Sequence, residues 1–342
     1  MSQAAPPASV GRGMARLRPS QLRLALPLLA LLLLLAISLP FWALTSQYTI
    51  GVAVRVLIFA SLAVAWALLS GYGGQVSFGH AAFFGLGAYT STLLMNDFRI
   101  TPWLGMLAGV VVAVIASVVI GFPSFRLRGI YFSLVTFAFS LILQILFTYY
   151  SRLTGGAVGL SVPLLGNRPD YYQFEGLYVY YFIGLLLLAL TLGSTYAFMR
   201  SRLGIYLLAL RDSHEAAESL GVNTTLVKMA ALALSAALCA LLGTLYVQYT
   251  YFIDPNSAFG VGVSLQIALL AIAGGLGVIW GPALGAVVLI PLAEFLNTSV
   301  GGSHAGLQLI IYSAVLILVI LVFPRGLAGA VTDAWAALRR GR

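Results

Sequence analysis

The sequence has 342 residues, of which 61% are hydrophobic and 8% are charged, and its formal net charge is +9. So small a charged fraction excludes an ordinary soluble domain, in which about a quarter of the residues are charged. The basic residues are scattered through short gaps between apolar segments, which argues against nucleic-acid binding and for membrane topology. Cys239 is the only cysteine, so neither a disulfide framework nor a cysteine metal site is expected.

The N-terminal 23 residues carry four arginines and no acidic residue, and we expect them to form a disordered basic arm in the cytoplasm. The leucine-rich residues 24–44 then predict the first membrane span. A positive flank before a leucine run is also typical of a cleaved signal peptide. No small-residue cleavage site follows, however, and many more spans do, so an uncleaved anchor is favoured.

Ten segments are long and apolar enough to cross about 30 Å of hydrocarbon. They are residues 24–44, 53–70, 78–95, 103–121, 129–150, 177–198, 229–250, 264–279, 282–297 and 305–323. We therefore predict an all-α polytopic membrane domain over 24–323, a cytoplasmic tail at 324–342 and both termini inside. This threading puts fourteen basic residues inside and four outside (Arg55, Arg99, Arg152 and Arg168), as the positive-inside rule requires.

Residues 71–89, GYGGQVSFGHAAFFGLGAY, contain six glycines within an otherwise apolar run. Each glycine in a helix interior costs up to about 1 kcal/mol relative to alanine. Irregular backbone at membrane depth is tolerated only where protein buries it or where it lines a wet pathway. This stretch therefore predicts a broken or re-entrant helix beside a transport route.

Two polar loops interrupt the later spans. The external loop, residues 151–176, either docks a soluble partner or is an ordinary ordered loop, and composition does not decide between them. In the cytoplasmic loop, residues 199–228, Asp212 and Glu215 have capping-box spacing and Gly221 is a stop signal, which predicts a helix of about two turns. Its apolar face would comprise Ala216, Ala217 and Leu220.

Residues 274–285, GGLGVIWGPALG, predict a second helix break at Gly274, Gly275 and Pro282. The spacing of Gly277, Gly281 and Gly285 by fours favours close helix packing over a substrate contact. The loose echo of the break at 71–89 suggests two related halves around a pathway.

Signs of catalysis are lacking in this sequence. Lys228 is the only lysine and no phosphate-binding glycine loop precedes it, the three histidines are widely separated, and Ser77 lacks a nucleophile-elbow context. We expect no catalytic residue, cofactor or metal site. Ionisable residues inside the predicted spans are few, namely Arg55, His80 and Glu294, so the energy for transport is expected to come from another subunit.

Six stretches, spread over roughly residues 50–330, resemble the LivM-type permease of branched-chain amino acid ABC importers. They are residues 71–89, RLRGIYFSLVTFAF (126–139), TGGAVGL (154–160), LGIYLLALRDSHEAAESLGV (203–222), GGLGVIWGPALG (274–285) and PRGLAG (324–329). The sister LivH permease has a different sequence at the glycine-rich break, which favours LivM. Permeases of the same superfamily that import urea or another small polar solute are similar enough to remain an alternative.

The resemblance implies a bacterial inner-membrane assembly of two permeases, two cytoplasmic ATPases and a periplasmic substrate-binding protein. It also implies that Glu215, Ala216, Ala217 and Gly221 form the EAA motif that couples a permease to its ATPase. Arg211 and Asp212, which precede the motif, are expected to contact the ATPase. ATP-driven movement of this helix would switch the permease pair between inward-open and outward-open packings.

The glycine-rich breaks are expected to line the substrate route, with backbone N–H groups near the start of a half-helix solvating a substrate carboxylate. The route residues expected from the sequence are Gln75, Ser77, Gly79, His80, Phe84, Gly274, Gly275 and Gly277. For the aromatic residues, helix packing is the favoured alternative. Two other classes of function stay open: a stand-alone secondary carrier coupled through Arg55, His80 or Glu294, and a channel that needs no nucleotide.

Overall fold

The computed structural model describes residues 46–127, 129–301 and 305–340, which fold almost entirely into helices. The longer helices are α2 (Gln47–Ser70), α3 (His80–Phe98), α4 (Pro102–Ser124), α5 (Ile130–Tyr149), α7 (Leu177–Arg200), α8 (Arg202–Asp212), α10 (Thr224–Thr250), α12 (Val261–Gly274), α13 (Gly281–Leu296), α14 (Ala305–Val322) and α15 (Gly326–Arg340). The short elements are α6 (Ser151–Thr154), η1 (Gly156–Val158), β1 (Leu160–Ser161), η2 (Pro169–Tyr171), α9 (His214–Ser219), β2 (Phe252–Ile253), α11 (Pro255–Phe259) and the π-helical turn η3 (Asn297–Gly301).

Among the described residues, seven helices, or eight if the bent pair α14–α15 is one span, are long and apolar enough to cross a membrane. The polytopic all-α class is thus confirmed, but the count of ten spans is not. The arm at 1–23 and the span predicted at 24–44 lie outside the described residues. The span predicted at 78–95 corresponds to α3, which the count omits although it is a 19-residue helix.

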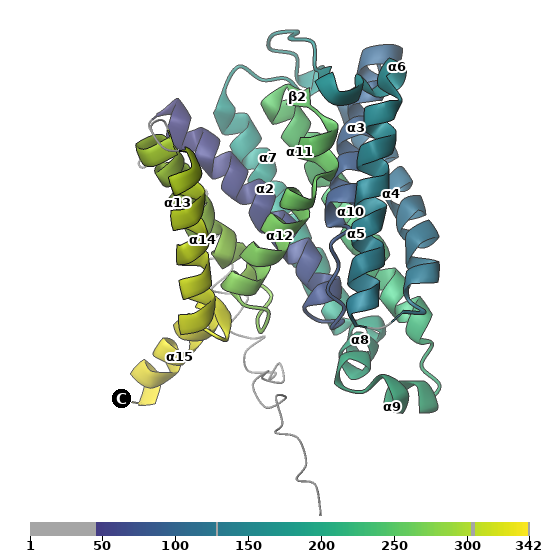
Figure 1. The fold of residues 1–342 in the computed structure, drawn as a ribbon, viewed down its shortest axis with the longest axis vertical. Helices are drawn as coiled ribbons and strands as arrows, with labels where there is room; N and C mark the ends of the chain where they lie inside the picture. Colours follow the sequence, from purple (N-terminus) through teal and green to yellow (C-terminus); the bar gives the residue numbers. More distant parts are fainter. Residues whose placement is uncertain (1–45, 128, 302–304, 341–342) are drawn as a thin grey trace, which may run out of the picture.

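Polar elements gather at the two ends of the helix bundle (Figure 1). One end carries α8, α9 and α15, and we call it the α9 end. The opposite end carries α6, η1, η2 and the two-stranded antiparallel sheet in which Leu160 pairs with Ile253 and Ser161 with Phe252. Basic residues that the sequence assigned to opposite sides of the membrane lie at opposite ends of the bundle. Arg200 and Arg202 flank the α7–α8 junction at the α9 end, whereas Arg152 lies in α6 at the other end.

Helix α3 lies at the centre of the bundle, where α4 and α10 pack closely against it. The contacts are backbone to backbone: a Cβ at Gly87 would collide with the main chain of Ala240, and one at Gly243 with the carbonyl oxygen of Phe84. On the other side of α3, a Cβ at Gly109 of α4 would lie 3.0 Å from the Cα of Gly87. Small residues allow such close approach of membrane helices.

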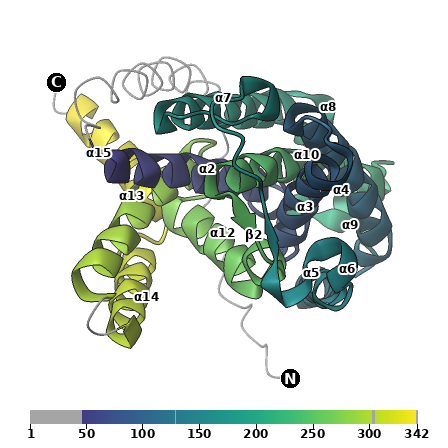
Figure 2. The same ribbon diagram turned by 90° about the horizontal axis from the view of Figure 1, so that it is seen from above.

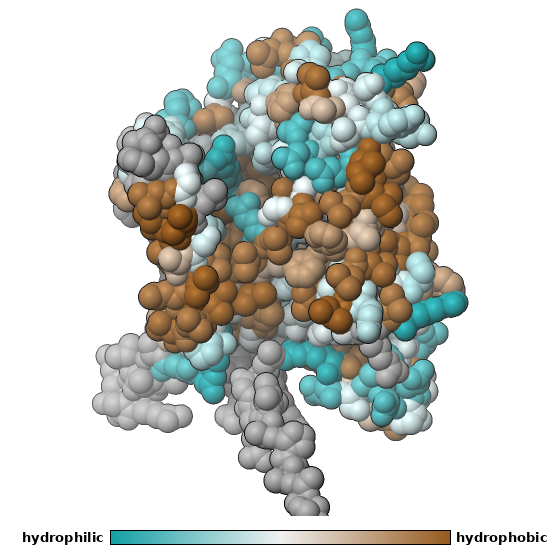
Figure 3. All heavy atoms as spheres, in the orientation of Figure 1, coloured by the Kyte–Doolittle hydropathy of each residue, from teal (hydrophilic) through white to brown (hydrophobic). Residues whose placement is uncertain are grey.

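Helix α4 presents the opposite kind of surface on its outer side. Leu104, Leu107, Val111, Ile115 and Val118 recur at intervals of three or four residues and are all exposed. Figure 3 shows that apolar residues form a broad band around the middle of the visible face, with hydrophilic residues above and below it. This is the pattern of a protein surrounded by hydrocarbon at mid-height and by water at both ends.

Helices α13 and α14 stand apart from α3, α4 and α5 in both ribbon views (Figures 1 and 2). Between these groups lie α11 and α12, whose N-terminal part is near α5. The segment formed by α11 and α12 thus contacts α5 on one side and α13 on the other.

Replacing Gly87 with leucine is expected to lower the melting temperature of the detergent-solubilised protein by several degrees. Overpacking a tight core costs about 1–3 kcal/mol, and here the new side chain meets the main chain of α10, which cannot rotate away. Gly193→Leu in α7 is the matched control, because nothing lies within 4 Å of its Cβ position. Equal melting temperatures for the two variants would contradict the packing described.

Candidate functional site

The glycine-rich stretch breaks the chain between α2 and α3, as predicted. Gly71 caps α2, Gly74 has a φ of +67°, and the chain runs without regular structure until α3 begins at His80. A Cβ at Gly71 would lie 2.7 Å from the carbonyl oxygen of Ala67. A side chain at Gly71 is therefore excluded, and the break is confirmed at residues 71–79.

A second break, at Gly260, was not foreseen. Asp254 forms a capping box with Ser257 at the start of α11, Pro255 occupies the first turn, and Gly260 separates α11 from α12. The span predicted at 264–279 is therefore wrong in its bounds, since α12 runs from Val261 to Gly274 and the apolar segment as a whole begins at Pro255. The Asp-Pro-Asn-Ser sequence is a helix-start signal that could have revealed it.

The third break lies between α12 and α13, where the sequence predicts it. Gly275 has a φ of +106°, and α13 begins at Gly281. Gly281 and Gly285 meet the main chain at Gly275 and Gly274, which confirms helix packing as the role of their spacing, whereas Gly277 is exposed and has nothing within 4 Å of its Cβ position.

Four polar side chains of α5 form a seam along one helix face, and each contacts one of the first two breaks. Ser133 Oγ donates to the carbonyl oxygen of Val76 (2.6 Å), and Thr136 Oγ1 accepts from the N–H of Phe78 (3.1 Å). Further along, Ser140 Oγ donates to the carbonyl oxygen of Phe259 (2.8 Å), and Gln144 Nε2 donates to Asn256 Oδ1 (3.3 Å).

This α5 seam was missed by sequence reasoning, although its signal is visible. Ser133, Thr136, Ser140 and Gln144 follow one another at intervals of three or four residues in an otherwise apolar helix, so they share one face. Polar residues inside a membrane helix seek partners away from lipid. Their spacing therefore indicates a helix face directed at irregular backbone.

The two breaks meet near the middle of the membrane. Ser140 lies halfway along α5, so its bond to Phe259 places the α11–α12 break close to the midplane. The first turn of α3 reaches the same region, because the N–H of Ala81 donates to Ser264 Oγ of α12 (3.2 Å). Irregular segments near the midplane that are held by neighbouring helices are characteristic of transporters.

The route residues expected near the first break are mostly buried. Ser77, Gly79, His80 and Phe84 have little or no exposed surface, while Gln75 is partly exposed and its Oε1 has no hydrogen-bond partner. Four of the amide groups there already have partners within the protein. The N–H groups of Ser77, Phe78, Gly79 and Ala81 donate to the hydroxyls of Ser70, Thr136, Ser77 and Ser264 respectively.

His80 is held in one orientation by a short hydrogen-bond chain. Ser235 Oγ donates its single proton to the carbonyl oxygen of Ala65 (2.6 Å), so it accepts from His80 Nε2 (2.9 Å). The other ring nitrogen, Nδ1, is buried without a partner. The imidazole thus joins α3 to α2 and α10 as a neutral structural group.

The remaining ionisable residues noted within the spans, Arg55 and Glu294, form an ion pair between α2 and α13. The hydroxyl of Tyr48 donates to the main-chain oxygen of Glu294 (3.5 Å). An opposite charge at close range satisfies each group, as ionisable residues in membrane helices require.

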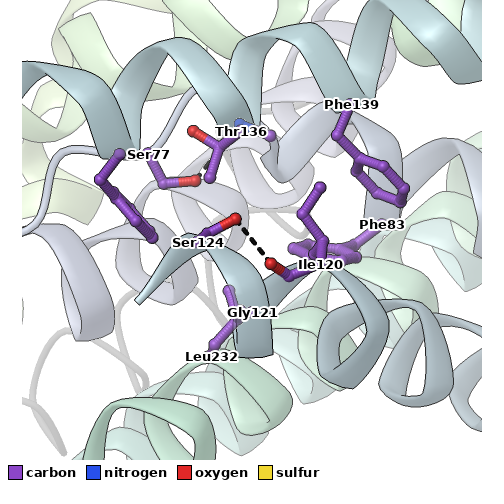
Figure 4. A pocket seen from close by; sticks show the side chains of 10 residues that line it. Ser77, Phe83, Ile120, Gly121, Ser124, Thr136, Phe139 and Leu232 are labelled. Carbon is purple, nitrogen blue, oxygen red and sulfur yellow. Dashed lines mark hydrogen bonds between the residues drawn. The ribbon is translucent and has the colours of Figure 1, made fainter. Parts of the chain in front are cut away.

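A small cavity lies between the first break and the α5 seam (Figure 4). Its volume is about 10 Å³, which is room for about one water molecule. Its walls are Ser77, Gly79, Phe83, Ile120, Gly121, Ser124, Phe132, Thr136, Phe139 and Leu232. Ser124 is turned to its own helix, where its Oγ donates to the carbonyl oxygen of Ile120 (2.6 Å), and this enclosed form offers no room for an amino acid.

The short helix predicted in the cytoplasmic loop is present as α9, but its start differs from the prediction. Ser213, not Asp212, is the cap: its side chain accepts from the N–H of Ala216, while Asp212 ends the preceding helix α8, which was not foreseen. The stop at Gly221 is confirmed by its φ of +80°. Ala217 is buried, whereas Glu215 and Ala216 are exposed.

Arg211 turns away from the exposed side of α9. Its Nη1 donates to the carbonyl oxygen of Gly71 (3.1 Å), so this guanidinium contacts the first break from α8. Asp212 is exposed at the end of the same helix.

An exposed ion pair orders the loop at the opposite end. Arg168 donates from Nε and Nη2 to the two carboxylate oxygens of Asp170 (3.2 and 2.8 Å), and these bonds lower the pKa of Asp170. Trp103 Nε1 donates to the carbonyl oxygen of Pro169 (2.9 Å), which ties the loop to the start of α4. Residues 151–176 therefore form an ordered segment rather than a loose linker.

Comparison with known proteins identifies the family. The profile of the family described as branched-chain amino acid transport system / permease component matches residues 18–320. The LivM permeases of Escherichia coli K12 and Salmonella typhimurium are each 30% identical to this chain, over 79% and 78% of it and 68% and 67% of their own lengths. The E. coli K12 LivH permease is 27% identical over 79% of this chain and 91% of its own length.

No solved structure matches this fold. The match to the family extends over most of the chain and includes all three breaks, the α5 seam and α9. The chain therefore belongs to the family of branched-chain amino acid transport system permease components, and it is a permease of the LivM type.

Proposed function

We propose that this chain forms half of the translocation pathway of an ABC importer for branched-chain amino acids and that α9 couples it to a cytoplasmic ATPase. The observation that carries the proposal is α9 itself. A six-residue helix, capped at Ser213 and stopped at Gly221, projects at one end of the bundle and exposes Glu215 and Ala216 of the Glu-Ala-Ala sequence.

The anchoring of α9 supports a role as a rigid lever. Ala217 is buried, and the N–H of Val222 donates to its carbonyl oxygen (3.1 Å), which closes the C-terminal turn. Leu220 is 84% exposed at the same turn. An exposed large apolar residue beside a capped helix is suited to burial in a partner's groove.

The proposed assembly has four kinds of component. A LivH-type permease completes the pathway, two ATPases bind at the α9 end, and a periplasmic binding protein delivers substrate to the ordered loop at the opposite end. The similarity of this one chain to both LivM and LivH permeases supports pairing of two subunits with related folds. The α9 end is then cytoplasmic and the membrane is the inner one.

The proposed route runs past the breaks held by the α5 seam. Gln75 and Gly277 have exposed surface and lie on the breaks themselves, so we assign them to the route's lining. The other expected route residues are buried behind this lining and hold it in place: Ser77, Gly79, His80, Phe84, Gly274 and Gly275. Since these backbone groups already have partners, the route offers dipoles but few free donors, which suits rapid passage of a zwitterion selected elsewhere.

ATP-dependent uptake tests the proposal. We expect Glu215→Ala and Gly221→Val to reduce ATP-driven leucine uptake into vesicles by about tenfold or more, because the first removes a charged contact and the second forces a β-branched residue into a left-handed conformation that ends α9. Asp97→Ala, which removes an exposed acidic residue near the C-terminal end of α3 and outside residues 151–176, is the matched control.

The amount of ATPase that co-purifies with each variant shows whether the variant has lost assembly or has lost coupling after assembly. Wild-type uptake in both α9 variants, with normal assembly, would remove the coupling role. Uptake that collapses with a protonophore but ignores ATP would instead establish a secondary carrier, and ATP-dependent uptake of urea in place of leucine would reassign the substrate.

Impermeant maleimide labelling of whole cells tests the orientation. In a Cys239→Ala background expressed without the ATPase subunits, which are proposed to cover Leu220, we expect Val158→Cys to be labelled from outside and Leu220→Cys to be labelled only after the cells are permeabilised. The two side chains are 83% and 84% exposed, so they are matched in accessibility and differ in the end on which they lie. The reverse pattern would invert the proposed topology.

A further inference from the structure

The contact between Arg211 and the glycine-rich break suggests how α9 acts on the membrane domain. We propose that Arg211 is the positioning residue that transmits movement of α9 to residues 71–79, and thereby to the start of α3. The inference rests on the proposed coupling function. It replaces the expectation, drawn from the sequence, that Arg211 contacts the ATPase.

Arg211 lies where two helices end. It belongs to the last turn of α8, one residue before Asp212 and three before the start of α9. Its Nη1 donates to the carbonyl oxygen of Gly71, the residue that caps α2 (3.1 Å). The C-terminus of a helix carries partial negative charge and unpaired carbonyl groups, so one guanidinium favours the alignment of both helix ends.

Side chains of α8 pack directly against the glycines of the break. A Cβ at Gly74 would lie 3.1 Å from Arg211 Cγ and 3.7 Å from Arg211 Cβ, and one at Gly73 would lie 3.1 Å from Leu207 Cδ1. Leu207 is fully buried. The absence of side chains at these two positions therefore lets α8 rest directly on the main chain of the break.

The other end of the break is fixed to the membrane domain. Val76 lies only five positions after Gly71, and its carbonyl oxygen accepts from Ser133 of α5. Phe78 is bound to Thr136 of the same helix. Beyond them, Ala81 in the first turn of α3 is bound to Ser264 of α12. A shift of α8 at Gly71 is thus passed along a short, anchored segment to α5, α3 and α12.

A second connection between α9 and the membrane domain exists, since α9 is followed at once by α10, which packs on α3 and α4. The two connections make different predictions. If α10 alone transmits the movement, the Arg211 side chain is dispensable for transport. If Arg211 is an ATPase contact, its removal weakens binding of the ATPase.

The experiment compares Arg211→Ala with Arg202→Ala in the complete transporter, reconstituted in proteoliposomes. Arg202 is an exposed arginine at the other end of α8, so the two variants lose the same charge from the same helix. Three quantities are measured: the amount of co-purified ATPase, the rate of ATP hydrolysis and the rate of leucine uptake.

We expect Arg211→Ala to bind the ATPase normally and to hydrolyse ATP, while the number of ATP molecules used per leucine rises about tenfold, as loss of a charge-assisted hydrogen bond allows. Arg202→Ala should keep the wild-type ratio. An unchanged ratio in Arg211→Ala would overturn the proposal, as would loss of the ATPase from the purified complex.

A second variant perturbs the same contact from the other side. Gly74→Ala places a methyl group against Arg211 in a residue with a φ of +67°, and Gly129→Ala, with a φ of +61° and nothing within 4 Å, controls for backbone strain. The ATP-to-leucine ratio should rise in Gly74→Ala but not in Gly129→Ala. If Arg211→Ala does not fold, the two glycine variants provide the test. Equal ATP-to-leucine ratios in these two variants would reject the proposal. Wild-type uptake by the α9 variants described above would instead reject the coupling function itself.

Discussion

Main-chain polar groups inside the membrane must find partners within the protein, and this requirement governs how the three breaks are built. At the first two breaks, hydroxyl groups of α5 bind main-chain groups of Val76, Phe78 and Phe259, and the Gln144 amide binds the side chain of Asn256. In hydrocarbon, an unpaired amide or carbonyl costs several kcal/mol. The α5 seam is therefore what allows two irregular segments to exist near the midplane, and the central position of α3 follows from it.

The arrangement also explains why glycines and hydroxyl residues occur together in so apolar a chain. Glycines bring main chains within contact distance, as at Gly87 of α3 and Gly243 of α10, and hydroxyls such as Ser264 and Ser235 then cap or cross-link the helices that have come close. Neither class of residue introduces a fixed charge. Among the described residues, the charged side chains lie towards the two ends of the bundle or, as with Arg55 and Glu294, form an ion pair between helices.

Local signals in the sequence were sufficient where the chain's own chemistry decides the structure. Gly71 to Gly79 and Gly275 were recognisable because helix-breaking residues act on the nearest turn, and Gly221 because a left-handed stop has a strong residue preference. The cap at Ser213 was assigned one residue too early, since Asp212 and Ser213 are both good caps and only the preceding helix α8 decides between them. The direction of the Arg211 side chain depended on Gly71, 140 residues away, and no local pattern carries that information.

The contact between Gly87 and Ala240 has a consequence for how this protein can change over generations. In most cores, a larger side chain on one helix can be accommodated by a smaller one on its neighbour. Here glycine already faces main chain, so no smaller neighbour is available and compensation is impossible. Variation should therefore accumulate along the outward side of α4 and leave the α3–α10 crossing unaltered.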